Sequence, residues 1–307
     1  MTGRRILITG ASGFIGTALA RELAASGYDV VALTRNARAS RARFHENVAL
    51  QEWDGRSAAG WGRLADGALA IVNLAGDNLA QGRWTRSKKD RILQSRMDAG
   101  AAVVEAVRAA GIKPEVLLQA SAVGAYGWRG DEELDESASF GTGFLADVVK
   151  LWEDSTKEAE ALGVRRAIIR SGIVLGKAGG VWPRLTLPFR FFAGGPLGNG
   201  RQWFSWISLE DEVRAVRFLI ERQDLSGTFN LAAPGPLKQM EFCRILGKAM
   251  KRPCRLPVPA IVLRVLFGEK AIETLLAGQR VMPRRLIEAG FDFRLSDAES
   301  AIAALLK

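Results

Sequence analysis

Three glycines near the N-terminus have the spacing of a turn that binds a phosphate group. Gly10, Gly13 and Gly16 lie in the segment GASGFIG, after the apolar run RRILIT and at the start of a helical pattern. In such a turn, unpaired N–H groups and the macrodipole of the helix N-terminus face the anion. The first glycine permits the tight turn, the second the approach of a pyrophosphate, and the third close packing of helix on strand. The sequence therefore predicts a dinucleotide site, with GxxGxxG spacing in place of GxGxxG.

The residues after the second strand indicate whether the site binds NAD(H) or NADP(H). An acidic residue about 20 positions after the glycines would bind the ribose 2′-hydroxyl of NAD, but Thr34 and Arg35 stand there, and Asp29 lies at the other end of the strand. Arginine suits a 2′-phosphate by its charge and its planar donor fork. We therefore expect NADP(H), held by Arg35, with Arg38 as a residue that could share or take this role. A solvated surface arginine is the alternative.

The elements that must position these residues alternate between strand and helix. Buried-strand patterns cover residues 4–9, 29–33, 48–52, 69–74, 116–120 and 166–170. The clearest helical patterns between them cover residues 14–26, 85–110 and 143–162. This alternation is typical of a parallel, doubly wound sheet with right-handed crossovers. We predict an α/β fold with a Rossmann-type NADP(H)-binding domain over residues 1–175.

After residue 175 the pattern changes, with frequent Gly and Pro and short strand signals. A strand near 228–232 is expected to rejoin the first sheet, and helical patterns cover 240–250, 260–267 and 297–306. We predict a smaller, mostly helical substrate lobe and C-terminal domain over residues 176–307. Its candidate substrate-wall residues are Trp182, Arg184, Gln202, Trp203 and Trp206. Packing in a core is the alternative for these aromatic side chains.

The composition is that of an ordinary globular protein, with 48% hydrophobic and 25% charged residues. No apolar run approaches the roughly 18 residues of a membrane span, and we recognise no signal peptide, so we expect a soluble, cytoplasmic protein without a membrane partner. Cys243 and Cys254 lack paired spacing and His45 is the only histidine, so we expect neither a disulfide nor a metal. The net charge of +10 is spread over scattered arginines without a recognition motif, so we expect no nucleic-acid partner.

Motifs along the whole chain form a recognisable set. They are TGASGFIG at 9–16, NLAG at 73–76, Ser121 after the fifth strand, and RSGIVLG at 170–176. With them the chain resembles the NAD(P)-dependent epimerase/dehydratase family of extended short-chain dehydrogenase/reductases. The segments 187–190, 194–198, 204–207 and 276–283 are similar to its atypical, sugar-nucleotide epimerase-like branch, which has a C-terminal domain of unknown function.

The resemblance implies a set of cofactor contacts. The phosphate cradle would consist of Gly10, Ser12, Gly13, Phe14 and Ile15, with Arg35 on the 2′-phosphate. The ribose or pyrophosphate would lie against Leu74 and Ala75, and the nicotinamide between Ser121 and Val174. Arg91 and Arg96, on the helix after the fourth strand, would also face the cofactor, with a solvated helix face as the alternative.

One departure from the family pattern limits what the resemblance implies about catalysis. Family enzymes use a Tyr-x-x-x-Lys pair, in which the tyrosine transfers a proton and the lysine lowers its pKa. Here Lys150 is present, but Ala146 stands four residues before it. Tyr126, five residues after Ser121, could reach the same cleft, so Ser121, Tyr126 and Lys150 are the candidate catalytic residues. Glu153 and Asp131 are other candidate acids, and a salt bridge or a solvated loop is their simpler role.

Three functions fit these observations. The first is an oxidoreductase or epimerase-like enzyme that acts on a small polar substrate, for example a nucleotide-linked one, with hydride transfer at NADP(H). The second is a catalytically silent NADP(H)-binding protein that reports redox state to a partner. The third is a nucleic-acid-associated member of the branch. Turnover that consumes NADPH would separate the first from the second.

Overall fold

A seven-stranded parallel sheet forms the centre of the computed structural model, which describes residues 4–307. Its strand order is β12-β7-β5-β4-β1-β2-β3. The strands are β1 (Arg5–Thr9), β2 (Asp29–Thr34), β3 (Val48–Glu52), β4 (Ala70–Asn73), β5 (Val116–Ala122), β7 (Arg165–Ser171) and β12 (Gly227–Leu231). Because the chain moves outward from β1 in both directions, the order reverses beside β1, as in a Rossmann fold. The predicted fold class is confirmed.

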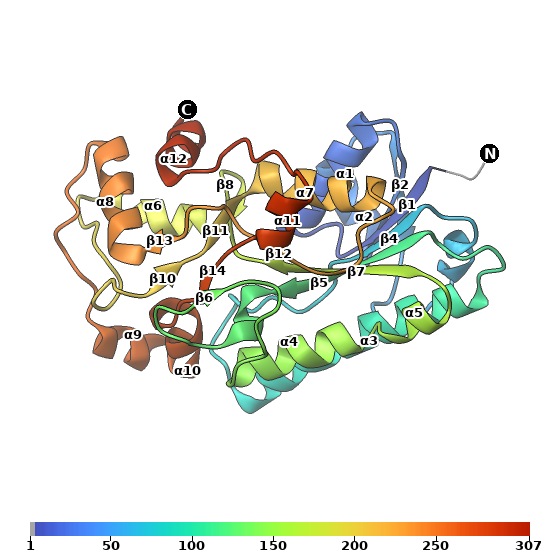
Figure 1. Cartoon of the computed structure of the whole chain (residues 1–307), viewed down its shortest axis with the longest axis horizontal. Coiled ribbons are helices and arrows are strands. Elements are labelled where there is room, and N and C mark those ends of the chain that lie inside the picture. Colours follow the sequence, from blue (N-terminus) through green and yellow to red (C-terminus); the bar gives the residue numbers. More distant parts are fainter. Residues whose placement is uncertain (1–3) are drawn as a thin grey trace.

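Helices cover both faces of this sheet (Figure 1). On one face lie α1 (Phe14–Ala25) and α7 (Leu209–Glu221), and on the other α3 (Arg86–Ala109), α4 (Phe144–Asp154) and α5 (Glu158–Ala161). Alternate strand residues point to opposite faces, so Ile6 and Ile8 join the core under α1 and α7 whereas Leu7 joins the core under α3.

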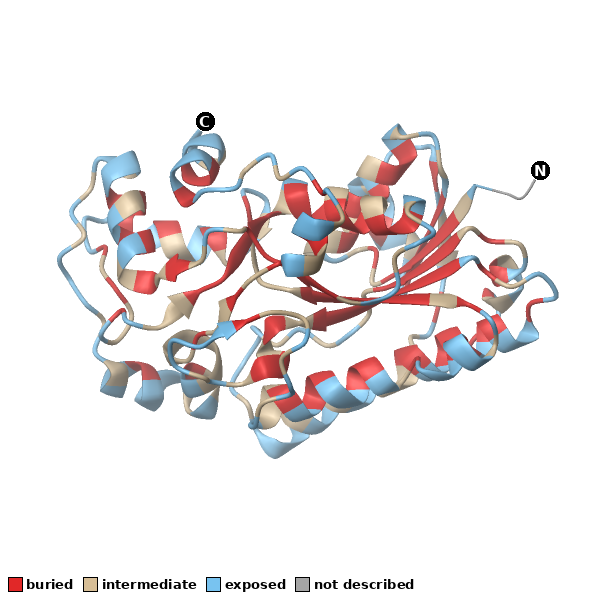
Figure 2. Ribbon diagram, in the orientation of Figure 1, coloured by how far each residue is buried: buried red, intermediate tan, exposed pale blue. Residues whose placement is uncertain are grey.

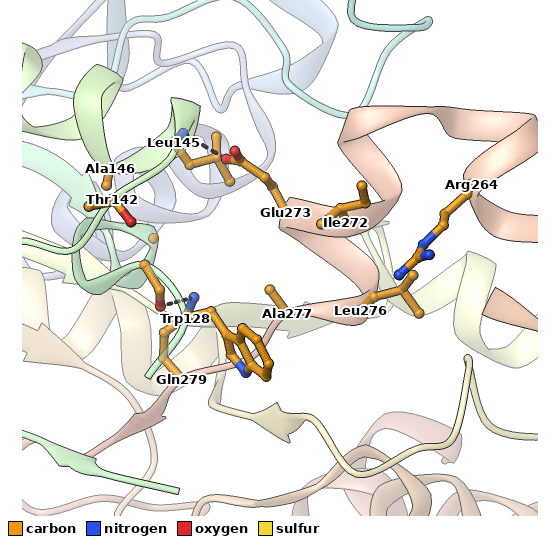
Figure 3. A pocket seen from close by; sticks show the side chains of 12 residues that line it. Trp128, Thr142, Leu145, Ala146, Arg264, Ile272, Glu273, Leu276, Ala277 and Gln279 are labelled. Carbon is orange, nitrogen blue, oxygen red and sulfur yellow. Dashed lines mark hydrogen bonds between the residues drawn. The ribbon is translucent and has the colours of Figure 1, made fainter. Parts of the chain in front are cut away.

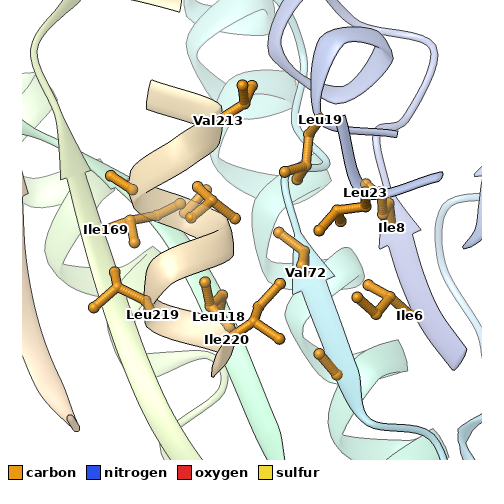
Figure 4. Packing of buried hydrophobic residues seen from close by; sticks show 14 of the residues in the cluster. Ile6, Ile8, Leu19, Leu23, Val72, Leu118, Ile169, Val213, Leu219 and Ile220 are labelled. Atoms are coloured by element: carbon orange, nitrogen blue, oxygen red, sulfur yellow. The ribbon is translucent and has the colours of Figure 1, made fainter. Parts of the chain in front are cut away.

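The packing under α7 is shown in Figure 4, where Leu219 and Ile220 approach Ile169 and Leu118 of the sheet. Burial of each such side chain stabilises the fold by about 1.5–3 kcal/mol. Figure 2 shows the consequence, a sheet that is buried along nearly its whole width. Apolar packing on both faces therefore holds the sheet in place, and with it the carboxyl ends of the strands.

Several helices differ from the sequence-based expectation, and two of them bear on the sheet. The helix expected over 143–162 is divided into α4 and α5, because the chain leaves α4 after Asp154 and the Ser155 hydroxyl donates to the Trp152 carbonyl at 2.7 Å. Helix α7 was not predicted. Its signal is Ser208, which accepts a hydrogen bond from the Asp211 N–H at 3.0 Å and precedes three acidic residues in the first turn.

The C-terminal region is helical, as predicted, and has a core of its own. Its helices are α6 (Trp182–Arg190), α8 (Gln239–Met250), α9 (Ala260–Phe267), α10 (Glu269–Ala271), a π-helical turn (Ile272–Leu276), α11 (Arg284–Glu288) and α12 (Ala298–Leu306). Short strands accompany them: β8 (Ile173–Gly176), β9 (Gly179–Gly180), β10 (Trp203–Phe204), β11 (Trp206–Ser208) and β13 (Leu237–Lys238). Strands β6 (Glu133–Leu134) and β14 (Arg280–Val281) pair and join this region to the loop after β5. No helix among residues 4–307 is both long and apolar enough to span a bilayer.

One carboxyl group is buried beneath α7 without a compensating cation. Glu212 is fully buried and accepts a hydrogen bond from the Ser171 hydroxyl at 2.6 Å. Its second oxygen has no partner in the described part of the chain. Burial raises the pKa of Glu212 to about 7 despite the hydrogen bond from Ser171, which lowers it. The folded protein therefore holds this side chain neutral at mildly acidic pH.

We expect Glu212 to make the fold less stable as the pH rises. The unfolded-state pKa of a glutamate is about 4.3, so the folded state holds the proton more tightly, and stability is lost between that value and the folded pKa. Relative to Glu212→Gln, the wild type should lose about 2–3 kcal/mol of unfolding free energy between pH 5 and pH 8 in urea titrations. The exposed Glu210→Gln is the matched control on the same helical turn. This expectation is wrong if the difference in unfolding free energy between the wild type and Glu212→Gln is the same at pH 5 and pH 8.

Candidate functional site

The glycine turn is built by close packing against the end of β4. Gly10 has a φ of +64°, and a Cβ there would lie 2.8 Å from the carbonyl carbon of Leu74. A Cβ on Gly16 would lie 2.5 Å from the Gly10 carbonyl oxygen. Gly13 differs, because it is exposed, has a φ of −77°, and its Cβ would come only within 3.1 Å of that same oxygen. Gly10 and Gly16 are required by the packing of the turn, whereas Gly13 leaves open space at the start of α1.

The N-terminus of α1 has the properties of an anion site. Gly13 is its N-cap and provides no side-chain acceptor, and the first turn contains no acidic residue. The earliest N–H that bonds within the helix is that of Thr17, which donates to the Gly13 carbonyl at 3.0 Å. The N–H groups before it, together with the helix dipole, can bind a phosphate.

The ring of Phe14 explains why glycines stand at the end of β8 and in β9. A Cβ on Gly176, Gly179 or Gly180 would lie 2.8–2.9 Å from the ring of Phe14. The hairpin of β8 and β9 therefore rests directly on the first residue of α1, and Val174 of β8 packs on the same core. This contact was not predicted, because the two segments are far apart in the sequence and either could have been an ordinary loop.

A chain of buried polar groups fixes the strand ends beside the turn. The Thr9 hydroxyl donates to Asn73 Oδ1 at 2.6 Å and accepts from the N–H groups of Leu74 and Ala75 at 3.1 and 3.2 Å. The Asn73 amide in turn donates to Gln119 Oε1 at 2.9 Å. These bonds cross from β1 to β4 to β5, so Leu74 and Ala75 are held beside the glycine turn. A fully satisfied network of this kind makes the edge rigid.

The arginine cluster after β2 separates into two kinds of residue. Arg41 donates to the Val48 carbonyl at 3.0 Å and supports its own loop, and Arg43 donates to the Ser12 carbonyl at 2.7 Å, so it lies against the glycine turn. Arg35 and Arg38 are exposed, and the side chain of neither forms a hydrogen bond or ion pair within residues 4–307. Both are therefore free to bind an anionic group near the end of β2.

The two candidate arginines of α3, Arg91 and Arg96, are not equivalent. Arg96 is buried, donates to the carbonyls of Ile92 and Asp77 at 2.8 and 3.2 Å, and lies 4.6 Å from the ring centre of Trp152. Burial lowers the pKa of Arg96 to about 10, so it stays charged near neutrality. Arg91 is exposed and donates to the Ser87 hydroxyl at 3.0 Å. Arg96 supports the loop after β4 from below, and Arg91 faces solvent.

Ser121 belongs to a buried charged cluster. Its hydroxyl donates to Glu153 Oε1, and the Glu153 carboxylate accepts from Arg170 Nε and Nη2 at 2.8 and 3.0 Å. Both charged side chains are about 5% exposed. Burial alone would lower the pKa of Arg170, but the hydrogen bond and charge of Glu153 raise it overall. Glu153, which the sequence offered as a candidate acid or a salt-bridge residue, is an ion-pair partner here.

Tyr126 contacts this cluster, whereas Lys150 does not. Tyr126 is fully buried, its hydroxyl donates to Asn230 Oδ1 at 2.7 Å, and its ring lies 4.9 Å from the Arg170 guanidinium. Burial raises the pKa of Tyr126. Lys150 is exposed on α4 and has no hydrogen-bond partner in the described structure. The fold thus brings Ser121 and Tyr126 close to Arg170 and leaves Lys150 outside.

A cavity of about 300 Å³ lies between the first domain and the C-terminal region (Figure 3). Its walls come from the loop after β5, the start of α4, and the segment from α9 to β14. They include Gly124, Gly127, Trp128, Thr142, Leu145, Ala146, Arg264, Ile272, Glu273, Leu276, Ala277 and Gln279. Ala146, which stands where family enzymes have the tyrosine, lines this cavity, so the missing ring contributes to the open space.

The C-terminal region closes the cavity through two polar contacts. Glu273, in the π-helical turn, accepts hydrogen bonds from the N–H groups of Phe144 and Leu145 at 2.9 and 2.8 Å. Gln279 donates to the Gly127 carbonyl at 2.8 Å. Glu273 thereby caps α4, whose own N-cap, Gly143, has no side chain. Glu273, Arg264 and Gln279 were not predicted from the sequence, because no local pattern links them to residues more than 100 positions earlier.

The residues expected to form a substrate wall are mostly used for packing. Trp182 and Trp206 are buried in the core of the C-terminal region. Gln202 donates to the carbonyls of Leu197 and Leu275 at 3.0 and 2.9 Å, and the Trp203 indole donates to Asp131 at 2.7 Å. Arg184 is exposed. Core packing and loop support therefore account for the tryptophans, the glutamine and Asp131.

Known proteins share this architecture over the full chain. A human epimerase family protein, SDR39U1 (isoform 2), was solved with NADPH; it is 30% identical with a TM-score of 0.87, and the match covers 98% of each chain. A nucleoside-diphosphate sugar epimerase from Corynebacterium glutamicum is 31% identical with a TM-score of 0.76, covering 98% of this chain and 58% of that one.

Relatives at the level of sequence include the epimerase family protein YfhF of Bacillus subtilis, 37% identical over 98% of this chain and 97% of its own length. An epimerase family protein of Mycobacterium tuberculosis is 42% identical over 95% of this chain and 94% of its own. Residues 258–305 match a domain of unknown function, DUF1731. Residues 6–232 match the model of the NAD dependent epimerase/dehydratase family, and the chain belongs to that family.

Proposed function

We propose that the chain binds NADP(H) at the glycine turn and acts as an oxidoreductase or epimerase-like enzyme on a small polar substrate, such as a nucleotide-linked one. The observation that carries this proposal is the uncapped N-terminus of α1 with two unpaired arginines, Arg35 and Arg38, after the neighbouring strand. A pyrophosphate fits the first feature and a 2′-phosphate the second. The human relative solved with NADPH supports the same choice.

The proposed cofactor contacts follow from these positions. Gly10, Ser12, Gly13, Phe14 and Ile15 hold the pyrophosphate, Leu74 and Ala75 the adjoining ribose, and Val174 and Ser121 the nicotinamide end. Arg35 binds the 2′-phosphate, and Arg38 is placed to share it. Arg96 acts through the loop that it supports, and Arg91, whose Nε lies 3.8 Å from Asp77 Oδ2 of the same loop, is the proposed cofactor contact from α3. When bound, the cofactor supplies or accepts a hydride.

We assign the substrate to the cavity lined by Ala146. It adjoins the loop after Ser121, and Trp128 and Arg264 lie at its walls. Arg264 can bind an anionic group of the substrate, and Thr142 and Gln279 offer polar contacts. The free cysteines Cys243 and Cys254 suit a reducing, cytoplasmic compartment.

Because Ala146 stands in place of the family tyrosine, another group must transfer the proton. Ser121, Tyr126 and Lys150 are the proposed candidates, and Ser121 and Tyr126 are held in internal hydrogen bonds. For Ser121 to transfer a proton, its hydrogen bond to Glu153 must break during the reaction. For Tyr126, the hydrogen bond to Asn230 must break. This arrangement also favours a second candidate function, a catalytically silent NADP(H)-binding protein that reports redox state to a partner.

The first test concerns the choice of cofactor. We expect NADPH to bind at least tenfold tighter than NADH, a difference of about 1.4 kcal/mol or more, because Arg35 can pair with the 2′-phosphate. Arg35→Ala should remove most of this preference in fluorescence titrations and leave the affinity for NADH nearly unchanged. Arg21→Ala, which removes an exposed charge from α1, should keep the preference. Equal dissociation constants for the two cofactors in the wild type would refute the assignment.

The second test separates binding from packing in the glycine turn. Gly13→Val should abolish NADPH binding and leave the protein folded, because the branched side chain enters the phosphate path but meets only one backbone atom, at 3.1 Å from the Cβ. Gly16→Val should destabilise the fold itself, since its Cβ would lie 2.5 Å from a carbonyl oxygen. Circular dichroism melts and NADPH titrations measure the two effects. A folded Gly13→Val protein that still binds NADPH would remove the turn from the site.

The third test addresses Tyr126. Tyr126→Phe should lower the free energy of unfolding by about 1–3 kcal/mol, because the buried Asn230 amide loses a partner. Tyr28→Phe, which removes a hydroxyl bound to Glu221 at the surface, should change it by no more than about 0.5 kcal/mol.

Turnover then decides the chemical role. If Tyr126 transfers the proton, Tyr126→Phe should lower turnover roughly 10²-fold or more while NADPH affinity stays constant. If turnover is unchanged, Tyr126 does not transfer the proton, and substitutions of Ser121, Lys150 and Glu153 should be tested next. A broad screen of carbonyls and sugar nucleotides without NADPH turnover would favour the silent redox sensor.

A further inference from the structure

Large apolar side chains are exposed at the end of the molecule formed by α6, α9 and the segment between α8 and α9 (Figure 1). Phe191 is 75% exposed, and Ile261 and Val265 are each 65% exposed. We call this surface the α6–α9 face. Its apolar members are Leu187, Phe191, Phe192, Leu256, Ile261, Val262, Val265, Leu266 and Phe267. Patches of this kind on a folded protein mark sites that contact another apolar surface.

Helix α9 is the clearest part of this face. Its sequence, AIVLRVLF, contains one charged residue, yet only Leu263 is buried. Figure 2 shows that its outer side is exposed along its length. A helix that is apolar on nearly all sides is expected inside a core or against an apolar environment, not in water. The outer side of α9 therefore lacks the contact that its composition requires.

Backbone pairing joins the parts of the face. Residues 191–198 run beside residues 252–258, with parallel bridges between Gly194 and Cys254 and between Leu197 and Val258. The Leu256 N–H donates to the Gly194 carbonyl at 3.1 Å. At the α6 end, Arg252 lies 4.4 Å from the ring centre of Phe192. The exposed aromatic residues, Leu256 and α9 thus lie on adjoining segments.

The segments that form this face carry mostly positive charge, although Glu241 and Glu269 border them. Residues 177–209 and 242–268 contain ten Lys or Arg residues and no Asp or Glu. They are Lys177, Arg184, Arg190, Arg201, Arg244, Lys248, Lys251, Arg252, Arg255 and Arg264. Of these, Lys177 lies in the hairpin of β8 and β9 beside α1, and Arg264 lines the cavity. None of the ten forms an ion pair with an acidic side chain of residues 4–307, although arginines elsewhere do, for example Arg217 with Glu22 and Glu221. This end of the molecule is both apolar and positively charged.

We propose that the α6–α9 face binds the surface of a lipid bilayer that contains anionic lipids. Exposed Phe, Ile, Val and Leu side chains can enter the boundary between head groups and acyl chains, while Lys and Arg neutralise the anionic head groups. The expectation of no membrane partner rested on the length of apolar runs. That length excludes a helix that spans a bilayer, whereas a surface that lies on one does not need it.

Other occupants fit this face less well. A symmetric contact with a second copy would place the same cationic surface against itself, and like charges across an interface oppose association. A nucleic acid would match the charge, but it offers no apolar counterpart for the aliphatic side chains of α9. An anionic bilayer matches both properties.

Co-sedimentation of the full chain with lipid vesicles tests the proposal. The probes are phosphatidylcholine vesicles with about one third phosphatidylglycerol, and phosphatidylcholine vesicles alone as the neutral comparison. We expect binding to the anionic vesicles, weaker binding at high salt, and little binding to the neutral vesicles. The double variants Phe191→Ser with Phe192→Ser, and Ile261→Ser with Val265→Ser, should each weaken binding by about tenfold or more.

A matched control is Ile112→Ser, which changes a 63% exposed apolar residue outside the face. It should sediment with anionic vesicles like the wild type. The proposal is overturned if the wild type does not sediment with these vesicles or if both double variants bind as well as Ile112→Ser. It is also overturned if light scattering shows a dimer that the double variants dissociate, or if RNA displaces the vesicles and binding to RNA is lost in the same variants. All these substitutions lie on exposed side chains, so circular dichroism should show folded proteins throughout.

Discussion

The buried ion pair between Glu153 and Arg170 is the interaction on which the arrangement of the site depends. It joins α4 to β7 with two hydrogen bonds in a region where both side chains are about 5% exposed. A charge in such a place is tolerated only with a close partner, and removal of one member typically costs 3–5 kcal/mol. Because Ser121 also bonds to Glu153 and the ring of Tyr126 packs on Arg170, this pair holds both candidate catalytic residues in place.

The same pair explains why the site differs from the usual proton relay of the family. A relay along α4 needs a phenol one turn before the lysine and a free hydroxyl on β5. Here Ala146 leaves the first position empty, and the Ser121 hydroxyl is already directed to Glu153. The space beside Ala146 is closed from the other side by Glu273, which caps α4 from the C-terminal region. The C-terminal domain therefore completes the cavity instead of forming a separate unit.

The sequence could predict what depends on neighbours along the chain. Strand and helix patterns gave the sheet, and the spacing of Gly10, Gly13 and Gly16 gave the turn, because a few adjacent residues determine each feature. It could not predict contacts between distant segments, such as the bond from Tyr126 to Asn230, which are 104 positions apart. Likewise, only the fold shows that Arg41 supports a loop whereas Arg35 is free, since both have the same type and nearly the same neighbours.

The net charge of +10 is not spread evenly, because some cations form ion pairs with carboxylates and others do not. Arginines such as Arg170, Arg166 and Arg217 are held by carboxylates, and their charge is largely compensated within the fold. Part of the uncompensated charge lies beside the glycine turn and around the α6–α9 face, where several cations have no acidic partner among the described residues. Unpaired cations beside a helix N-terminus favour a small anion held by directed hydrogen bonds. Unpaired cations around exposed apolar side chains favour an extended surface that is both anionic and apolar. The two proposed ligands therefore differ because the side chains beside each group of cations differ, not because of the total charge.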